Sequence, residues 1–317
     1  MERGAGTEDM MKVQILLSTY NGQKYLAQQL DSILGQTYSN WCLLIRDDGS
    51  SDETATIAED YVKRYPDRIR FISEENRGAC QSFLALAQQA DEQCDYYAFC
   101  DQDDVWKEDK LERAVRALEK EQAENLPLLY CSALEVVDER LDVLFCKDLS
   151  VYAERLGFGN ALVENVCTGC TMVLNICSLA ALRELPGSVA EHILMHDWWV
   201  YLYVSCFGRV IYDSYAGISY RQHQNNVVGE TPGGFKKLCH KIQTFRGNRG
   251  KLRGQMAAFG EMYGNRMPQE KRELLMECLN LHGHPRKRLA LARSGRIYRL
   301  NRRNQLVCKL LIILDFL

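Results

Sequence analysis

The stretch that decides the fold is an apolar run with an acidic end, Tyr96-Tyr97-Ala98-Phe99-Cys100 followed by Asp101-Gln102-Asp103-Asp104. The uncharged, aromatic-rich run predicts a buried strand, so the carboxylates emerge together at its carboxyl end. Carboxylates this close repel one another, and a hard divalent cation such as Mg²⁺ or Mn²⁺ relieves the repulsion. Alternatively, Asp103 or Asp104 caps the helix that carries Leu111, Val115 and Leu118. The residues alone leave both interpretations open.

The same pattern of strand, polar turn and helix precedes this stretch. Strands are predicted at Val13–Thr19, Trp41–Arg46 and Ile69–Ser73, and helices at residues 25–34, 50–65 and 79–90. Ser50 and Glu53 have the spacing of a capping box for the second of these helices. Regular alternation of strands and helices predicts a doubly wound α/β fold with a mostly parallel sheet. Ligands of such sheets bind outside the carboxyl ends of the strands.

The second half of the chain is less regular. Short strands are expected within residues 128–144 and at Val210–Tyr212 and Ile218–Tyr220, and a helix is expected near Asp197. Residues 231–317 hold 19 lysines and arginines against 5 acidic residues, whereas residues 1–230 hold 20 against 37. This asymmetry predicts a domain over residues 12–230 and a basic, mainly helical extension over residues 231–317. The apolar C-terminal run at residues 306–317 is too short to span a bilayer.

Composition and cysteine usage limit the class of protein. The chain has 317 residues, 46% of them hydrophobic, which is enough to bury a large core and excludes a disordered or fibrous protein. Its 13 cysteines are odd in number and scattered, and the N-terminal stretch does not read as a signal peptide, so we expect a cytoplasmic protein without disulfides. Cys167 and Cys170 form an isolated pair that only weakly suggests zinc or redox chemistry.

Two nucleotide-binding motifs are missing. The turn after Val13–Thr19 lacks the G-x-G-x-x-G pattern of dinucleotide-binding folds, and the chain has no P-loop, so any nucleotide must be held by other means. Tyr20 could stack on a base, and Asp48 could accept a hydrogen bond from a base N–H. The simpler alternative makes both of them ordinary turn residues.

The string His196-Asp197-Trp198-Trp199 also has two interpretations. Asp197 can cap a helix whose tryptophans lie in the core. It can instead act as a general base beside indoles that stack on sugar rings. His223 is either a metal ligand or a surface histidine, and its spacing alone does not decide between them.

In combination, these motifs resemble the inverting glycosyltransferases of family 2, which have the GT-A fold. The resemblance covers roughly residues 12–230 and is closest to bacterial rhamnosyltransferases of cell-surface polysaccharide synthesis. The residues that carry it are Ser18–Asn21, Asp47–Asp52, Asn76–Gly78, Asp101–Trp106, Thr168–Met172, His196–Trp199 and Tyr220–Gly229.

The resemblance assigns expected roles to individual residues. Asp197 corresponds to the base that deprotonates the acceptor hydroxyl, and Asp103 and His223 correspond to metal ligands. His196 replaces the glutamate common in the wider family and leaves the base in place. The expected nucleotide-sugar contacts are Ser18, Thr19, Tyr20, Asn21, Asp48, Arg77, Asp101 and Gln102, and the expected acceptor contacts are Thr168, Gly169, His196 and Trp198.

The implied reaction is Mn²⁺- or Mg²⁺-dependent transfer of a sugar, with L-rhamnose from dTDP-L-rhamnose as the leading donor. The expected acceptor is a cell-surface polysaccharide or lipid-linked glycan, and no nucleic-acid partner is expected. A UDP-hexose donor is the alternative, and an inactive carbohydrate- or nucleotide-binding module is an alternative of another class. The basic extension suggests peripheral contact with the inner face of the membrane. A solvated appendage or a homodimer interface is an equal alternative.

Overall fold

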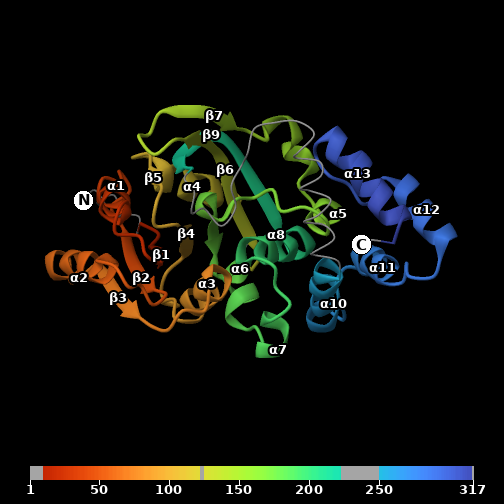
Figure 1. Cartoon of the computed structure of the whole chain (residues 1–317), viewed down its shortest axis with the longest axis horizontal. Helices are drawn as coiled ribbons and strands as arrows, with labels where there is room; N and C mark the ends of the chain where they lie inside the picture. The colour runs from red at the N-terminus through yellow and green to blue at the C-terminus, as the bar shows by residue number, and fades with distance from the viewer. Residues whose placement is uncertain (1–9, 122–124, 223–249, 316–317) are drawn as a thin grey trace, which may run out of the picture.

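A computed structural model describes residues 10–121, 125–222 and 250–315. Its centre is a nine-stranded sheet (Figure 1). The strands are β1 (Val13–Thr19), β2 (Trp41–Asp47), β3 (Ile69–Ser73), β4 (Tyr96–Cys100), β5 (Val105–Trp106), β6 (Leu128–Val137), β7 (Val143–Lys147), β8 (Val173–Asn175) and β9 (Arg209–Arg221).

The sheet has the order β3-β2-β1-β4-β8-β6-β9-β5, and β7 pairs with β6 at its side. Strands β1 to β4 are parallel, β8 is antiparallel to both of its neighbours, and β6 and β9 are parallel to each other. The predicted α/β fold with a mostly parallel sheet is therefore confirmed. Thr19 lies opposite Asp47, and Leu17 lies opposite Cys100. This register brings the polar ends of β1, β2 and β4 to one edge of the sheet.

Helices cover both faces of the sheet because its central strands are apolar on both sides. In β1, Ile15 and Leu17 belong to the core beneath α1, α2 and α4, whereas Leu16 belongs to the core beneath α3, α6 and α8. The first group is α1 (Leu26–Leu34), α2 (Thr54–Arg64) and α4 (Lys110–Glu119); the second is α3 (Ala79–Gln88), α6 (Ile176–Arg183) and α8 (His196–Phe207). The short helices are η1 (Ser150–Arg155), α5 (Phe158–Ala161), η2 (Gly169–Thr171) and α7 (Gly187–Ala190).

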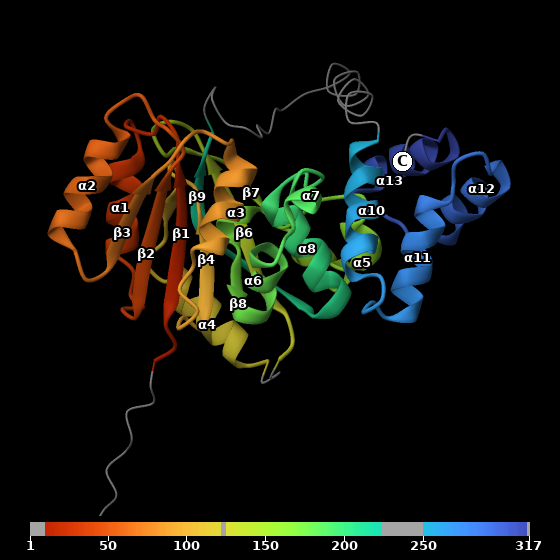
Figure 2. The ribbon, with the colours of Figure 1, turned by 90° about the horizontal axis from the view of Figure 1, so that it is seen from below.

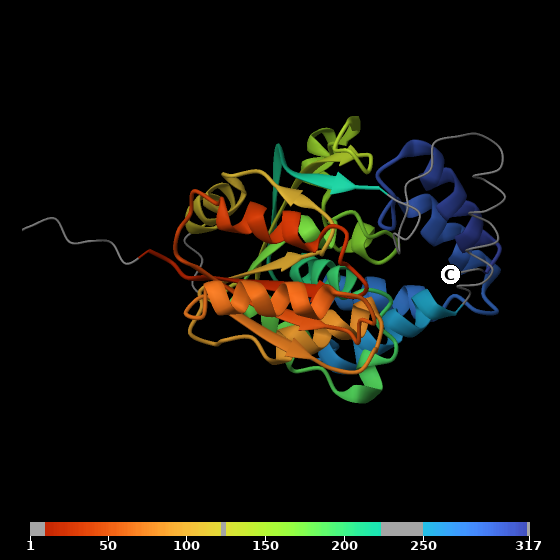
Figure 3. The same ribbon diagram turned by 60° about the vertical axis from the view of Figure 1, so that its left-hand side comes forward.

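The C-terminal helices extend the second of these cores. Phe259 and Tyr263 pack on Trp199 of α8, with ring centroids 5.4 and 6.2 Å away. Figure 2 shows these helices gathered at the end of the molecule opposite α2, and in Figure 3 they lie together, in blue, on the right. They are α10 (Lys251–Tyr263), α11 (Gln269–Leu279), α12 (Pro285–Ser294) and α13 (Arg302–Ile313). The helices expected beyond residue 231 are present over residues 250–315. The division into two domains near residue 231 stays a prediction.

None of the helices in the described ranges has the length and apolar character needed to cross a bilayer.

Three local predictions are wrong. Ser50 does not cap α2, because its hydroxyl is bound to Asp47 while Asp52 Oδ1 accepts the Thr54 N–H at 3.0 Å. Asp103 and Asp104 do not cap α4, because strand β5 intervenes and that helix begins only at Lys110.

The third wrong prediction concerns β9. The two short strands expected at Val210–Tyr212 and Ile218–Tyr220 are one continuous strand. Its register against β6 shifts after Asp213, where the Asp213 carboxylate accepts the Tyr215 N–H at 3.0 Å. This bulge accommodates the residues between the two predicted strands within one strand.

Candidate active site

The acidic loop after β4 contains two kinds of carboxylate. Asp101 and Asp103 are half-buried, whereas Asp104 is completely buried. Asp104 Oδ1 accepts the N–H of Arg221 at 3.2 Å. Ligand atoms of Asp101, Asp104 and Cys170 lie within 4.8 Å of one another. Because Asp104 is buried, Asp101 and Asp103 are the carboxylates that a diphosphate could approach.

The electrostatics of this loop favour a cation. Burial, together with the charges of Asp103 and Asp197, raises the pKa of Asp101 to about 7. Burial and the neighbouring carboxylates also raise the pKa of Asp104. A divalent cation would stabilise the ionised forms, and carboxylate oxygens are ligands that Mg²⁺ and Mn²⁺ prefer. Burial raises the pKa of the Cys170 thiol, which disfavours a thiolate ligand. The residues present therefore fit an oxygen-preferring cation.

Asp197 lies in the first turn of α8, against the same loop. Its Oδ2 accepts the Gly169 N–H at 3.1 Å, and its Oδ1 accepts the Trp198 N–H at 2.7 Å. Gly169 belongs to η2, which also contains Cys170, the residue whose thiol lies near Asp101 and Asp104. The effect of Asp197 on the pKa of Asp101 likewise requires the two carboxylates to be near each other. The structure thus brings the predicted base and the acidic loop together.

The turn after β1 is fixed by hydrogen bonds with the end of β2 and with the loop that follows β2. Thr19 is buried, and its hydroxyl donates to Asp47 Oδ1 at 2.9 Å. Asn21 has a φ of +47° and accepts the Ser51 N–H at 2.9 Å. Ser18 Oγ lies 2.6 Å from Ser82 Oγ, whereas Tyr20 is half exposed. Of these predicted nucleotide contacts, Tyr20 has the most freely available side chain.

The side chain of Gln102 holds the backbone of Tyr20 in place. The Gln102 amide accepts the Tyr20 N–H at 2.8 Å and donates to the Tyr20 carbonyl at 3.0 Å. A Cβ at Gly22 would lie 2.2 Å from Gln102 Oε1, so the glycine makes room for this pairing. The amide of Gln102, predicted to contact the nucleotide sugar, is therefore engaged in positioning the turn.

Asp48 is also strongly engaged by the protein. Its Oδ1 accepts from Arg46 Nη1 at 2.6 Å and from the Arg77 N–H at 2.9 Å, and its Oδ2 accepts the Gly78 N–H at 2.8 Å. The carboxylate is 2% exposed, while the Arg77 side chain is exposed. Asp48 thus fixes the loop that presents Arg77, and its contact with a base stays a prediction.

The residues predicted to contact the acceptor differ in their burial and in their hydrogen bonds. Thr168 is half-buried, and its hydroxyl accepts from Lys147 Nζ at 3.3 Å. Trp198 is half-buried and its indole N–H donates to the Ala161 carbonyl at 2.7 Å. His196 is buried, stacked on Phe83 with ring centroids 3.9 Å apart. Burial lowers the pKa of His196 to about 4. The surroundings of His196 are those of a neutral core side chain, and its acceptor role stays a prediction.

His223, the second predicted metal ligand, lies outside the described residues.

Two buried arginines that support the site were not anticipated. Arg46 is completely buried beneath Asp48 and also donates to Ser82 Oγ at 2.8 Å. Arg221 is 2% exposed and its Nε donates to the Asp103 carbonyl at 2.9 Å. For Arg46 the sequence does carry a signal, because a charge at the end of an apolar strand needs partners when buried.

Comparisons with known proteins show which proteins this chain resembles. Residues 14–138 match the model of the family described as Glycosyl transferase family 2. The chain is 30% identical over 224 residues to the dTDP-rhamnosyl transferase RfbG of Shigella flexneri, covering 67% of this chain and 73% of that relative. It is 38% identical over 110 residues to the putative glycosyltransferase EpsE of Bacillus subtilis, covering 34% and 39% of the two chains.

Similarity to solved structures extends over nearly the whole chain. The crystal structure of S. aureus TarS 1–349 matches with a TM-score of 0.55 at 15% identity, covering 96% of this chain and 81% of that one. The complex of the same protein with UDP-GlcNAc matches with a TM-score of 0.53 at 14% identity, covering 96% and 89% of the two chains. At these identities the likeness concerns the fold, which is the GT-A fold of glycosyltransferases.

Proposed function

Because the chain belongs to glycosyltransferase family 2 and is a hexosyltransferase, we propose that it transfers L-rhamnose from dTDP-L-rhamnose. The acceptor in this proposal is a cell-surface polysaccharide or a lipid-linked glycan. Residues 12–230 would form the transferase domain and residues 231–317 a basic extension, on the cytoplasmic side of the membrane.

One observation carries the proposal. Asp197 is held by the Gly169 N–H, and a carboxylate oxygen of Asp101 lies within 4.8 Å of the Sγ atom of Cys170, the residue next to Gly169 in η2. Inverting transfer requires a base on the acceptor side of the sugar and charge neutralisation on the diphosphate side. In this proposal Asp197 of α8 supplies the base on the acceptor side. The carboxylates after β4 supply the cation ligands on the diphosphate side.

Asp197 is proposed to accept the proton of the acceptor hydroxyl. The freed oxygen attacks the anomeric carbon of the sugar, and the bond from that carbon to the diphosphate breaks with its electron pair on the leaving oxygen. Because attack and departure occur on opposite faces, the configuration inverts. The Gly169 N–H keeps Oδ2 in place, so the carboxylate is oriented before the acceptor arrives.

Asp101 and Asp103 would hold the divalent cation, which neutralises the departing nucleoside diphosphate when it is bound. Asp101 is also proposed to contact the nucleotide sugar, while Tyr20 stacks on the base. Tyr20 is suited to stacking because it is half exposed and its backbone is fixed by Gln102. Ser18 and Arg77 lie at the same edge of the sheet, beside Ser82 and Asp48.

The choice of donor rests on similarity to the Shigella relative, whose name specifies a dTDP-rhamnosyl transferase. The test is a panel of dTDP-L-rhamnose, UDP-glucose and UDP-galactose, with release of the nucleoside diphosphate followed in the presence and absence of Mn²⁺. We expect release from dTDP-L-rhamnose that stops when the metal is chelated. Release from a UDP-hexose alone would reject rhamnose, and release that ignores chelation would reject the metal.

A further inference from the structure

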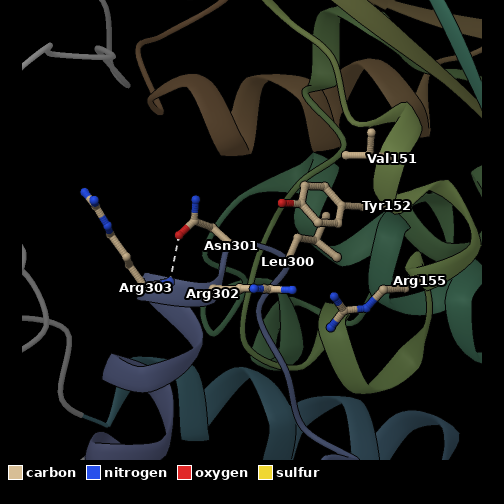
Figure 4. Close-up of a pocket in the computed structure, with 7 residues that line it drawn as sticks. All are labelled: Val151, Tyr152, Arg155, Leu300, Asn301, Arg302 and Arg303. Carbon is tan, nitrogen blue, oxygen red and sulfur yellow. Dashed lines mark hydrogen bonds between the residues drawn. The ribbon is translucent and has the colours of Figure 1, made fainter.

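A basic pocket lies between η1 and the start of α13. Arg155 comes from η1, and Arg302 and Arg303 begin α13, where Asn301 Oδ1 accepts the Arg303 N–H at 2.9 Å. Figure 4 shows the side chains of Arg302 and Arg155 pointing toward one another across this pocket. An adjoining hollow shares both of these arginines and adds Arg299. Four arginines therefore line these two adjoining hollows, although Arg303 points away from the Arg155–Arg302 pair in Figure 4 and Arg299 donates to the Val163 carbonyl.

Three of these arginines have no acidic partner among the residues that the structure describes. Within the described ranges, no carboxylate forms an ion pair with Arg155, Arg302 or Arg303, and all three are exposed. Like charges gathered in this way repel one another and produce a positive surface potential. Such a surface attracts an anionic partner, and its attraction is weakened by salt.

An apolar stripe continues from the arginines along α13. Leu306, Leu310, Ile313 and Leu314 are 64%, 57%, 38% and 59% exposed. Their spacing of four, seven and eight residues from Leu306 places them on one face of the helix. Leu306 itself lines the hollow shared by Arg155 and Arg302, so the stripe and the arginines form one continuous surface. We call the four arginines and four apolar residues the α13 surface.

The α13 surface is linked to the proposed base through one short segment. Arg299 donates from Nη2 to the Val163 carbonyl at 2.9 Å. Two residues earlier, the Ala161 carbonyl accepts the indole N–H of Trp198, the neighbour of Asp197, at 2.7 Å. Residues 161–163 thus connect the α13 surface with the helix that carries Asp197.

We propose that the α13 surface docks the protein on an anionic membrane. Arginines beside exposed leucines match the chemistry of a lipid interface, where phosphates lie next to acyl chains. The 12-residue helix α13 would lie in the plane of that interface. A symmetric contact with a second copy is disfavoured, since it would bring the same arginine cluster against itself. Membrane docking would bring the enzyme close to a lipid-linked acceptor, and only this link to the acceptor rests on the proposed function.

The experiment measures cosedimentation of the full chain with vesicles. Vesicles containing phosphatidylglycerol are compared with pure phosphatidylcholine, at low and high salt. We expect binding only to the anionic vesicles, with Arg302→Gln/Arg303→Gln weakening it about 30-fold because each lost charge costs about fivefold. Leu306→Ser/Leu310→Ser should also weaken binding by removing apolar insertion.

The matched control is Lys63→Gln/Arg70→Gln, which removes two exposed positive charges at the far end of the molecule, where α2 and β3 lie (Figure 2). It should bind like the wild type, and all variants should keep the wild-type circular dichroism and melting temperature within a few degrees. Equal binding by wild type and Arg302→Gln/Arg303→Gln would overturn the proposal, as would binding that ignores lipid charge.

Two further outcomes separate the alternatives. A wild-type dimer in solution that becomes monomeric in Leu306→Ser/Leu310→Ser would assign the stripe to a second copy and overturn the membrane role. Loss of vesicle binding on adding millimolar inorganic diphosphate at constant ionic strength would point instead to a free phosphate ligand. Vesicle binding needs no turnover, so its failure is distinguishable from failure of the proposed transfer. Activity on a soluble acceptor should be the same in all of these variants.

Discussion

The backbone N–H of Gly169 donates a hydrogen bond to Asp197 Oδ2 over 3.1 Å. This bond joins the turn η2 to the first turn of α8, so the position of the proposed base depends on a residue without a side chain. A Cβ at Gly169 would lie 3.1 Å from His196 Nε2 and 3.5 Å from Asp197 Oδ2. His196 has little freedom to move because it is stacked on Phe83.

Gly169→Ala should therefore lower the transfer rate about tenfold, because a displacement of a few tenths of an ångström misaligns the base. The added methyl group should also destabilise the fold by about 1 kcal/mol. Steady-state kinetics and urea unfolding measure the two effects. Gly187→Ala is the matched control, since a Cβ there meets no atom within 4 Å. Wild-type rates in Gly169→Ala would show that the base needs no such positioning.

Asp197→Asn should abolish transfer while leaving the binding of the nucleotide sugar intact. The amide is similar in size and still accepts one of the two backbone hydrogen bonds, but it cannot take the acceptor proton. The expected loss is roughly 10²- to 10⁴-fold in kcat. Product formation and donor titration by calorimetry measure the two properties. Turnover close to wild type in this variant would remove Asp197 from the mechanism.

The sequence predicted the structure best where a pattern of residues had a single physical cause. Apolar strands ending in polar turns identified β1, β2 and β4, and the parallel register of these strands then brought their ends together. One local signal failed because another local contact replaced it. Ser50 has the spacing of a cap, yet Asp47, three residues earlier at the end of β2, accepts the hydrogen bond of its hydroxyl.

The supporting residues of the site were harder to predict because their roles depend on distant segments. The contact of Gln102 with the nucleotide sugar stays a prediction, and the sequence does not show that its amide pairs with the backbone of Tyr20, 82 positions away. Asp48 is bound by Arg46 and by the 77–78 backbone, and only the folded chain brings that loop to it. The resemblance between motifs predicts which residues lie at the site. The hydrogen-bond partners of each side chain depend on how distant segments pack, which the motifs do not give.

Asp103→Ala should weaken metal-dependent binding of the nucleotide sugar. Removing one of the two half-buried carboxylates leaves Asp101 as the accessible oxygen ligand of the β4 loop. We expect a 10- to 100-fold weaker affinity, roughly 1.4 to 2.8 kcal/mol, when Mn²⁺ is titrated in the presence of dTDP. Asp67→Ala, at an exposed position between α2 and β3, is the control and should titrate normally. An unchanged titration in Asp103→Ala would assign the metal to other residues.

Arg221→Lys should loosen the acidic loop without changing any of its carboxylates. The buried guanidinium donates to the Asp103 carbonyl at 2.9 Å and to the Glu139 carbonyl at 2.6 Å, and it lies 4.4 Å from the Tyr25 ring centroid. A single ammonium group cannot reproduce this geometry. We expect a loss of about 2 kcal/mol in unfolding free energy together with weaker Mn²⁺ binding.

Urea unfolding and calorimetry would be compared with Arg209→Lys, where the arginine is exposed and pairs with Glu121. This control should change neither quantity appreciably. If Arg221→Lys loses stability but binds Mn²⁺ like the wild type, the arginine supports the fold and not the position of the acidic loop.

The last prediction concerns the stability of the protein in acid. Burial lowers the pKa of His196 to about 4, although the charge of Asp197 opposes the shift. The unfolded chain takes up a proton on this histidine below its ordinary pKa of about 6.5, whereas the folded protein does so only near pH 4. Stability should therefore fall as the pH drops from about 6.5 to about 4, by about 3 kcal/mol in total from this residue.

His196→Phe should remove this contribution, because a phenyl ring can stack on Phe83 and meet Phe99 edge-on without taking up a proton. The difference in unfolding free energy between wild type and variant, measured from pH 7 to pH 4.5, should change by up to 1.4 kcal/mol per pH unit. The acceptor KM at pH 7.5 should remain near the wild-type value if the histidine is a core side chain. A raised acceptor KM with no change in the pH dependence of stability would place His196 among the acceptor contacts instead.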